Sequence, residues 1–114
     1  MASVIAIDEF AQVEMRVGRI SDARPFREAR SPAYRLRIDF GPELGGRDSS
    51  AQLTVTYPDP AALIGTQVVA VVNLPPRRIA GFASEVLVVG AMGPDGAVHL
   101  LRPDPECAEG LRIG

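Results

Sequence analysis

Hydrophobic and polar side chains alternate most regularly between Tyr34 and Phe40. Every second residue of this segment is apolar, and the residues between them are charged. Because successive side chains of a β-strand point to opposite faces, this period of two is typical of a strand with one buried and one exposed face. The pattern therefore predicts a half-buried strand with Arg35, Arg37 and Asp39 on its exposed face.

Further strands are indicated by apolar segments that are rich in β-branched residues and bounded by Gly and Pro. Residues 67–74 are almost continuously apolar, which is typical of a strand buried on both faces. Gly18 marks an expected bulge or bend in the first strand. Two short helical turns are also expected, one over Glu9–Glu14 with Asp8 as its N-cap and one over Ala61–Ile64. Besides Tyr34–Phe40, the expected strands are Met15–Ala23, Ser50–Thr56, Gln67–Leu74, Glu85–Ala91 and Ala97–Leu101.

The order of these elements predicts the fold class. Five or six short strands, with a helical turn between the third and the fourth, are typical of an all-β, five-stranded OB-fold barrel. In such a barrel the binding face lies on strands two and three and the connecting loops. A β-sandwich is the alternative that the pattern leaves open. No repeat, linker or low-complexity segment divides the chain, so residues 1–114 are expected to form a single domain with one core.

The charged residues change this picture, because all of the positive charge belongs to arginine. The chain holds 12 arginines, no lysine and a formal net charge of −2. Dedicated nucleic-acid-binding domains usually carry a positive excess, so the overall charge argues against indiscriminate phosphate binding. Eight of the arginines lie between Arg16 and Arg47, and Ala23–Phe40 has a local excess of three positive charges. We therefore expect an acidic domain with one basic face, although a genome of high G+C content is an equally good reason for the arginines.

Cysteine usage and hydropathy indicate the cellular compartment in which the protein is expected. Cys107 is the only cysteine and has no partner for an internal disulfide, which favours the cytoplasm. No segment approaches the ~20 apolar residues of a membrane span. Asp8 and Glu9 follow the first apolar residues too closely for a secretion signal. A cytoplasmic protein with no membrane partner is expected.

Residues suited to catalysis are sparse. His99 alternates with leucines in the last expected strand, and Cys107 has no histidine nearby, so both are expected to be structural. The chain contains neither a glycine-rich phosphate loop nor a G-x-S-x-G nucleophile motif. We expect no enzymatic activity, no catalytic residue, no metal site and no cofactor.

Two polar segments stand out between the apolar strands, Asp48–Gln52 and Asn73–Glu85. Arginine offers a planar fork of donors that suits phosphate oxygens and stacks on bases, while serine and amide groups form hydrogen bonds with ribose or base edges. An exposed loop and a strand end capped by serine are the structural alternatives. The candidate RNA-contacting residues of the two segments are Asn73, Arg77, Arg78, Ser84, Ser49, Ser50 and Gln52.

The same segments carry a family resemblance. The run Val71–Val88, with Ser49–Gln52 and Phe10–Ile20 upstream, closely resembles the tRNA-binding-domain family and in particular its small, chaperone-like CsaA branch. The resemblance covers about Ile7–Ile113. It implies an OB-fold core, tRNA binding and terminal extensions that build a homodimer. Val86 departs from the Gly-Met that follows the Ser-Glu pair in synthetase-linked members, which favours the CsaA branch.

Two functions follow from this resemblance. In the first, the chain is a non-enzymatic, homodimeric tRNA-binding protein, and Arg24, Arg27 and Arg30 of the basic connection add to the contacts of the two polar segments. In the second, it is a molecular chaperone that holds unfolded or export-destined polypeptides. The candidate peptide-binding side chains of this alternative are Phe26, Tyr57 and Phe82. A purely architectural subunit would bind neither tRNA nor polypeptide.

Overall fold

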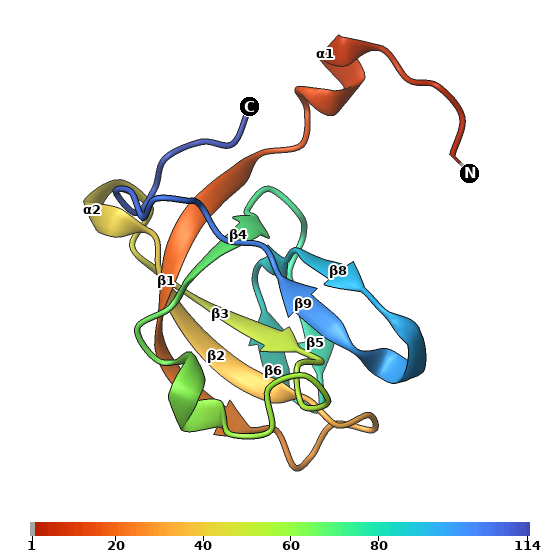
Figure 1. The fold of residues 1–114 in the computed structure, drawn as a ribbon, viewed down its shortest axis with the longest axis vertical. Helices are drawn as coiled ribbons and strands as arrows, with labels where there is room; N and C mark the ends of the chain where they lie inside the picture. The colour runs from red at the N-terminus through yellow and green to blue at the C-terminus, as the bar shows by residue number, and fades with distance from the viewer. Residues whose placement is uncertain (1) are drawn as a thin grey trace.

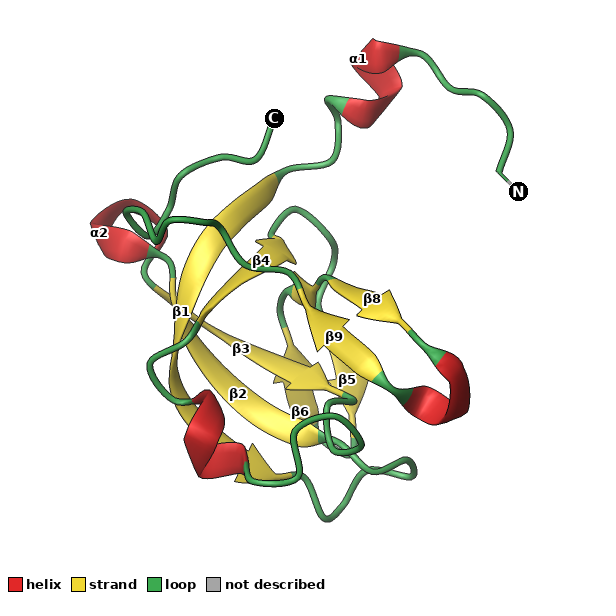
Figure 2. Ribbon diagram, viewed as in Figure 1, coloured by secondary structure: helices red, strands yellow, loops and turns green. Residues whose placement is uncertain are grey.

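The computed structural model describes residues 2–114 as a β-barrel with short helices at its edges (Figures 1 and 2). The strands are β1 (Met15–Pro25), β2 (Tyr34–Asp39), β3 (Gly46–Ala51), β4 (Gln67–Val71), β5 (Arg77–Ile79), β6 (Phe82–Ser84), β7 (Leu87–Val88), β8 (Gly90–Met92) and β9 (Val98–Leu100). The helices are α1 (Ile7–Phe10), α2 (Gly41–Leu44) and the 3-10 turns η1 (Pro60–Leu63) and η2 (Pro94–Gly96).

Five strands form the main sheet, in the order β3-β2-β1-β4-β7, and every neighbouring pair is antiparallel. The gap between the edge strands β3 and β7 is bridged by hydrogen bonds rather than by a regular ladder. The Glu85 amide donates to the Asp48 carbonyl at 2.8 Å, and the Ser49 hydroxyl donates to the Val86 carbonyl at 3.1 Å. The sheet is thereby a nearly closed barrel, which confirms the all-β, OB-like prediction and excludes the sandwich.

The interior of the barrel is filled by the inward side chains of the five strands. β2 alternates buried and exposed residues along its whole length, as its sequence pattern predicts, and all five residues of β4 are buried. Gly18 lies where β1 crosses the core, and a Cβ atom there would stand 2.5 Å from Ile38 Cγ2. Gly18 thus permits a close approach of side chains. The register shift expected at Gly18 occurs instead between Ile20 and Asp22.

Two expected strands differ from the structure. The third strand begins at Gly46 and ends at Ala51, so the prediction of Ser50–Thr56 was wrong over most of its length. Residues 46–49 join the strand because their backbone groups form hydrogen bonds with β2. The pairing with β2 ends at Ala51. The expected strand Glu85–Ala91 is divided into β7 and β8, because its two parts pair with different partners.

The N-terminal helix is shorter than the sequence suggests. α1 ends at Phe10, and its N-cap is Ala6 instead of the expected Asp8, because the Glu9 carboxylate accepts the Ala6 amide at 3.0 Å. α1 buries none of its residues and stands clear of the barrel, on the side where both termini lie (Figure 1). The turn η1 lies where one was expected and is capped by the Asp59 side chain. Within residues 2–114, no helix has the length and apolar character of a membrane span.

Candidate nucleic-acid interface

The polar segment Asn73–Glu85, within which the sequence predicts no separate strand, contains a β-hairpin. β5 pairs with β6 through a two-residue turn whose residues Ala80 and Gly81 have φ angles of 48° and 82°. Two consecutive positive φ angles are typical of the type I′ turn, which matches the twist of paired strands. Sequence inspection misses this hairpin because each strand has only three residues and Ala80 adopts a conformation that is rare outside glycine.

The hairpin separates the two arginines that are adjacent in sequence. Arg77 pairs with Ser84, and Arg78 pairs with Ala83, so alternation along the strand directs the two guanidinium groups to opposite faces. Arg77 lies on the face that turns toward β3, where the Ser50 amide donates to Ser84 Oγ at 2.9 Å. Arg78 lies on the other face and donates to the Gly81 carbonyl at 3.1 Å. The two predicted RNA contacts Arg77 and Arg78 therefore do not share one face of the hairpin.

Four of the predicted residues come together in one open cavity of about 390 Å³ between the hairpin, β3 and the basic connection. We call it the Arg77 hollow. Neither of its arginines takes part in an ion pair within residues 2–114, so both charges are available to a ligand. Glu28 is its one acidic lining residue. The predicted residues that line the hollow are Arg30, Ser50, Gln52 and Arg77.

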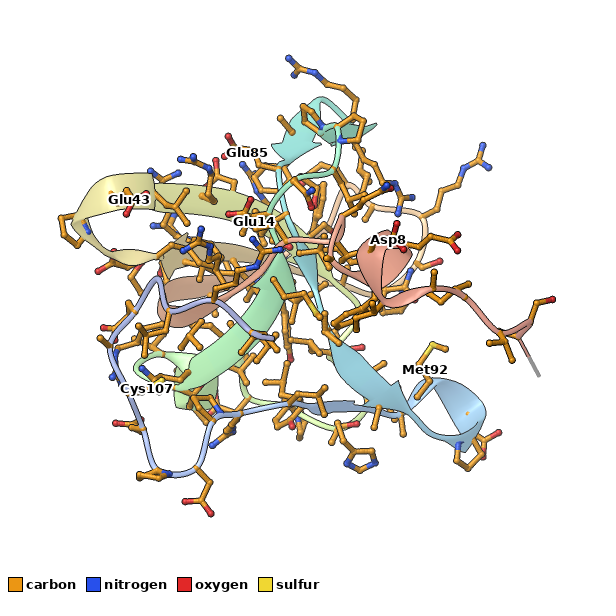
Figure 3. All side chains as sticks on the ribbon, turned by 90° about the horizontal axis from the view of Figure 1, so that it is seen from above. Asp8, Glu14, Glu43, Glu85, Met92 and Cys107 are labelled. Carbon is orange, nitrogen blue, oxygen red and sulfur yellow. The ribbon has the colours of Figure 1, made fainter. Side chains whose placement is uncertain are left out.

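Three other predicted RNA contacts serve the fold. Ser49 is fully buried, and Ser84 is only 8% exposed. The Ser49 hydroxyl holds β3 against Val86, and the Ser84 hydroxyl holds β3 against β6. Glu85, the residue between Ser84 and Val86, is labelled in Figure 3. Asn73 is exposed, but its amide accepts from the Glu14 amide at 2.9 Å and donates to the Gln12 carbonyl at 2.7 Å. These residues close the barrel and fasten the N-terminal segment.

Replacing Ser84 by alanine is expected to destabilise the domain without weakening RNA binding. The Ser50 amide would lose its acceptor in a partly buried place, and such a loss typically costs about 1–3 kcal/mol. Urea unfolding followed by circular dichroism measures this change, with the exposed Ser3→Ala as control. A direct RNA contact by Ser84 would instead show as weaker tRNA binding by the folded variant.

The three aromatic residues predicted for peptide binding do not form one exposed surface, because Phe26 is buried and Tyr57 and Phe82 are only partly exposed. Phe26 is 4% exposed and packs edge-on against Phe82, with ring centroids 5.3 Å apart. Tyr57 packs against the core, where its hydroxyl accepts from the Leu100 amide. The Tyr34 hydroxyl donates to the Tyr57 carbonyl at 2.7 Å, and burial, followed by the negative charge of Asp59, raises the pKa of Tyr34 and keeps the donor protonated. Packing in the barrel therefore covers most of Phe26 and part of Tyr57, while Phe82 stays partly exposed.

The remaining arginines divide into structural and exposed groups. Arg19 binds Glu109 and Glu106 of the C-terminal segment at 3.2 Å each, and hydrogen bonds to these two carboxylates raise the pKa of Arg19. Arg24 is exposed and pairs with Asp22 at 2.7 Å, while Arg27 is exposed and has no ion pair among the described residues. The basic connection therefore carries free charge beside the Arg77 hollow. The sequence places Arg35 only on an exposed strand face. In the structure its Cζ atom lies 4.3 Å from the ring centroid of Phe82, a stacking contact that the sequence pattern does not predict.

Comparisons with known proteins agree with the fold. Residues 15–112 match the family described as "Putative tRNA binding domain". The chaperone CsaA structure from Bacillus anthracis is 49% identical, with a TM-score of 0.92 over 98% of this chain and 100% of that one. The CsaA chaperone protein structure from Picrophilus torridus is 42% identical, with a TM-score of 0.89 over 97% and 100%.

A longer relative carries the same domain as one part. The methionine–tRNA ligase of Acidithiobacillus ferrooxidans is 37% identical over 109 residues, which are 96% of this chain and 16% of the ligase. The chain thus spans about a sixth of the curated relatives it matches, and it resembles two CsaA chaperone structures over their full length. The family match covers nearly all of the barrel, and the chain belongs to the tRNA-binding-domain family.

Proposed function

We propose that this domain binds tRNA through the Arg77 hollow and catalyses no reaction. The observation that carries the proposal is that Arg30 and Arg77, both unpaired within residues 2–114, face one cavity on the barrel of a tRNA-binding-domain protein. Arginine forks bind phosphate oxygens with two parallel hydrogen bonds. Ser50 and Gln52 lie beside them and offer the neutral donors and acceptors that ribose and base edges require.

The local charge explains how an acidic chain binds a polyanion. The formal net charge is −2, but Arg30 of the basic connection and Arg77 of the hairpin line the same hollow beside β3. At physiological salt the Debye length is about 8 Å, so a ligand at this face is influenced mainly by nearby charge. The remote carboxylates repel it little. If tRNA is the ligand, the domain acts in the cytoplasm.

We also propose that the chain forms a homodimer through its termini. Ile7 is 80% exposed and Phe10 is 39% exposed, on a helix that buries nothing against the barrel. Next to it, Val13 and Ile113 line an apolar cavity of about 460 Å³. A second copy that covers this surface would remove it from water and would present the Arg77 hollow twice to one large RNA.

Titration of purified protein with total tRNA at several salt concentrations tests the proposal. With about four phosphates neutralised, log K is expected to fall with log salt at a slope of about −3. Light scattering on the same sample is expected to give twice the 12.1 kDa chain mass. Absence of tRNA binding at low salt would contradict the function, and a monomeric mass would contradict the dimer.

A chaperone role is the second candidate, and a different observation favours it. An apolar cavity of about 260 Å³ adjoins the Arg77 hollow and shares Ser50, Arg77 and Ile79 with it. Its apolar lining residues are Leu74, Pro75, Ile79, Val86 and Leu87. Because the two cavities share a wall, tRNA is expected to displace a bound unfolded polypeptide. Simultaneous binding of both would show that this cavity is not the polypeptide site.

A further inference from the structure

A second hollow lies on the outer face of β1, β2 and β3, next to the Arg77 hollow. Its volume is about 180 Å³. Arg35 of β2 pairs with Ser50 across the sheet, and Phe82 pairs with Ile79 across the hairpin, so each of the two residues has its partner in the wall of the Arg77 hollow. We call this site the Arg35 hollow. Its lining side chains include Asp22, Arg24, Arg35, Arg37, Asp48 and Phe82.

Arg35 is held over an aromatic ring inside this hollow. Its Cζ atom lies 4.3 Å from the ring centroid of Phe82 and 5.5 Å from that of Phe26. The two rings pack edge to face at 73°, so the ring beneath the guanidinium is itself fixed. Among residues 2–114, no acceptor and no carboxylate binds the Arg35 guanidinium. The structure therefore fixes the position of a planar cation whose donors are unused.

The charged groups around Arg35 favour a nucleobase over a phosphate group as the ligand of this hollow. Arg24 pairs with Asp22 at 2.7 Å, and Arg37 pairs with Asp48 at 3.0 Å, so two carboxylates flank the stacked guanidinium. Carboxylates repel a phosphate group, but they accept hydrogen bonds from the N–H groups of a base. A nucleobase edge carries both donors and acceptors, and the hollow supplies partners for both. A guanidinium plane is also a surface on which a base stacks.

We propose that the Arg35 hollow receives one unpaired nucleobase of the bound RNA, stacked on the guanidinium of Arg35. The inference rests on the proposed function, since it needs RNA on this face of the barrel. It adds a preference for loops and strand ends, because a base that is paired within a duplex cannot enter the hollow. The Arg77 hollow would then bind mainly backbone, and the Arg35 hollow would hold a base.

The test compares two probes and two variants. The probes are a single-stranded RNA 12-mer and a second 12-mer in which the residues are abasic. Fluorescence anisotropy measures the binding of each. Arg35→Lys keeps the charge and removes the planar surface, whereas Arg35→Ala removes both. Since base stacking accounts for about 1–3 kcal/mol, both variants are expected to bind the normal 12-mer about tenfold more weakly. Binding of the abasic 12-mer is expected to change less than twofold with Arg35→Lys.

Arg102→Ala is the matched control, because Arg102 is exposed and lines neither hollow. Arg35 is also exposed, so its variants are expected to fold. If Arg35→Lys binds both probes as the wild type does, or if the variants weaken both probes equally, the hollow does not hold a base and the inference is wrong. The wild type would still bind tRNA in that case. If the wild type binds neither tRNA nor the two 12-mers, the proposed function is overturned as well.

Discussion

Arg77→Ala is expected to weaken tRNA binding about tenfold, whereas Arg78→Ala should weaken it less than threefold. A charge-assisted hydrogen bond contributes about 1.5–3 kcal/mol, and Arg77 has no competing carboxylate within the described chain. Arg78 lies on the opposite face of the hairpin and outside the Arg77 hollow. The salt dependence is informative too, because loss of one phosphate contact lowers the slope of log K against log salt by about 1.

Filter binding to total tRNA at constant salt measures both variants. Arg77 and Arg78 are exposed, so neither substitution is expected to alter the free energy of unfolding by more than about 0.5 kcal/mol. Arg102→Ala removes the same charge elsewhere and serves as the control. Equal losses for Arg77→Ala and Arg78→Ala would mean that the RNA contacts both faces of the hairpin. An unchanged affinity for Arg77→Ala would remove the Arg77 hollow from the interface.

The sequence predicted those strands whose local pattern and final pairing agree. β2 has a clean alternation because one of its faces is core and the other is solvent, and β4 is apolar after Gln67 because it is buried on both faces. β3 has no such pattern. Its polar residues become a strand because β2 supplies a ladder of hydrogen bonds, which is a long-range effect that no window of the sequence contains.

The sequence predicts the residue types of the candidate site but not their arrangement in space. Arg30, Ser50, Gln52 and Arg77 were selected for their chemistry, and the fold gathers them in one hollow. Ser49 satisfied the same chemical criterion but lies inside the barrel, because burial depends on the register of β3. The separation of Arg77 from Arg78 and the stacking of Arg35 depend on a three-residue hairpin, which has too short a pattern to be recognised.

Gly18→Ala is expected to lower the free energy of unfolding by about 2 kcal/mol and the melting temperature by about 10 °C. The added Cβ would stand 2.5 Å from Ile38 Cγ2 and 2.8 Å from Phe40 Cε1. Ile38 is fully buried and Phe40 is 1% exposed, so neither side chain has free space into which to move. β1 would have to shift against β2, although alanine is otherwise better suited to a strand than glycine.

Thermal unfolding followed by circular dichroism measures this loss, and Gly93→Ala is the matched control. A Cβ at Gly93 would meet Ala97 at 3.4 Å, and the φ angle there is −94°, so the same chemical change meets neither a clash nor a strained backbone. A stability of Gly18→Ala equal to that of the wild type would show that Ile38 and Phe40 repack freely. Since Gly18 lines neither hollow, the folded fraction of this variant should bind tRNA with unchanged affinity, which separates the requirements of the barrel from those of the interface.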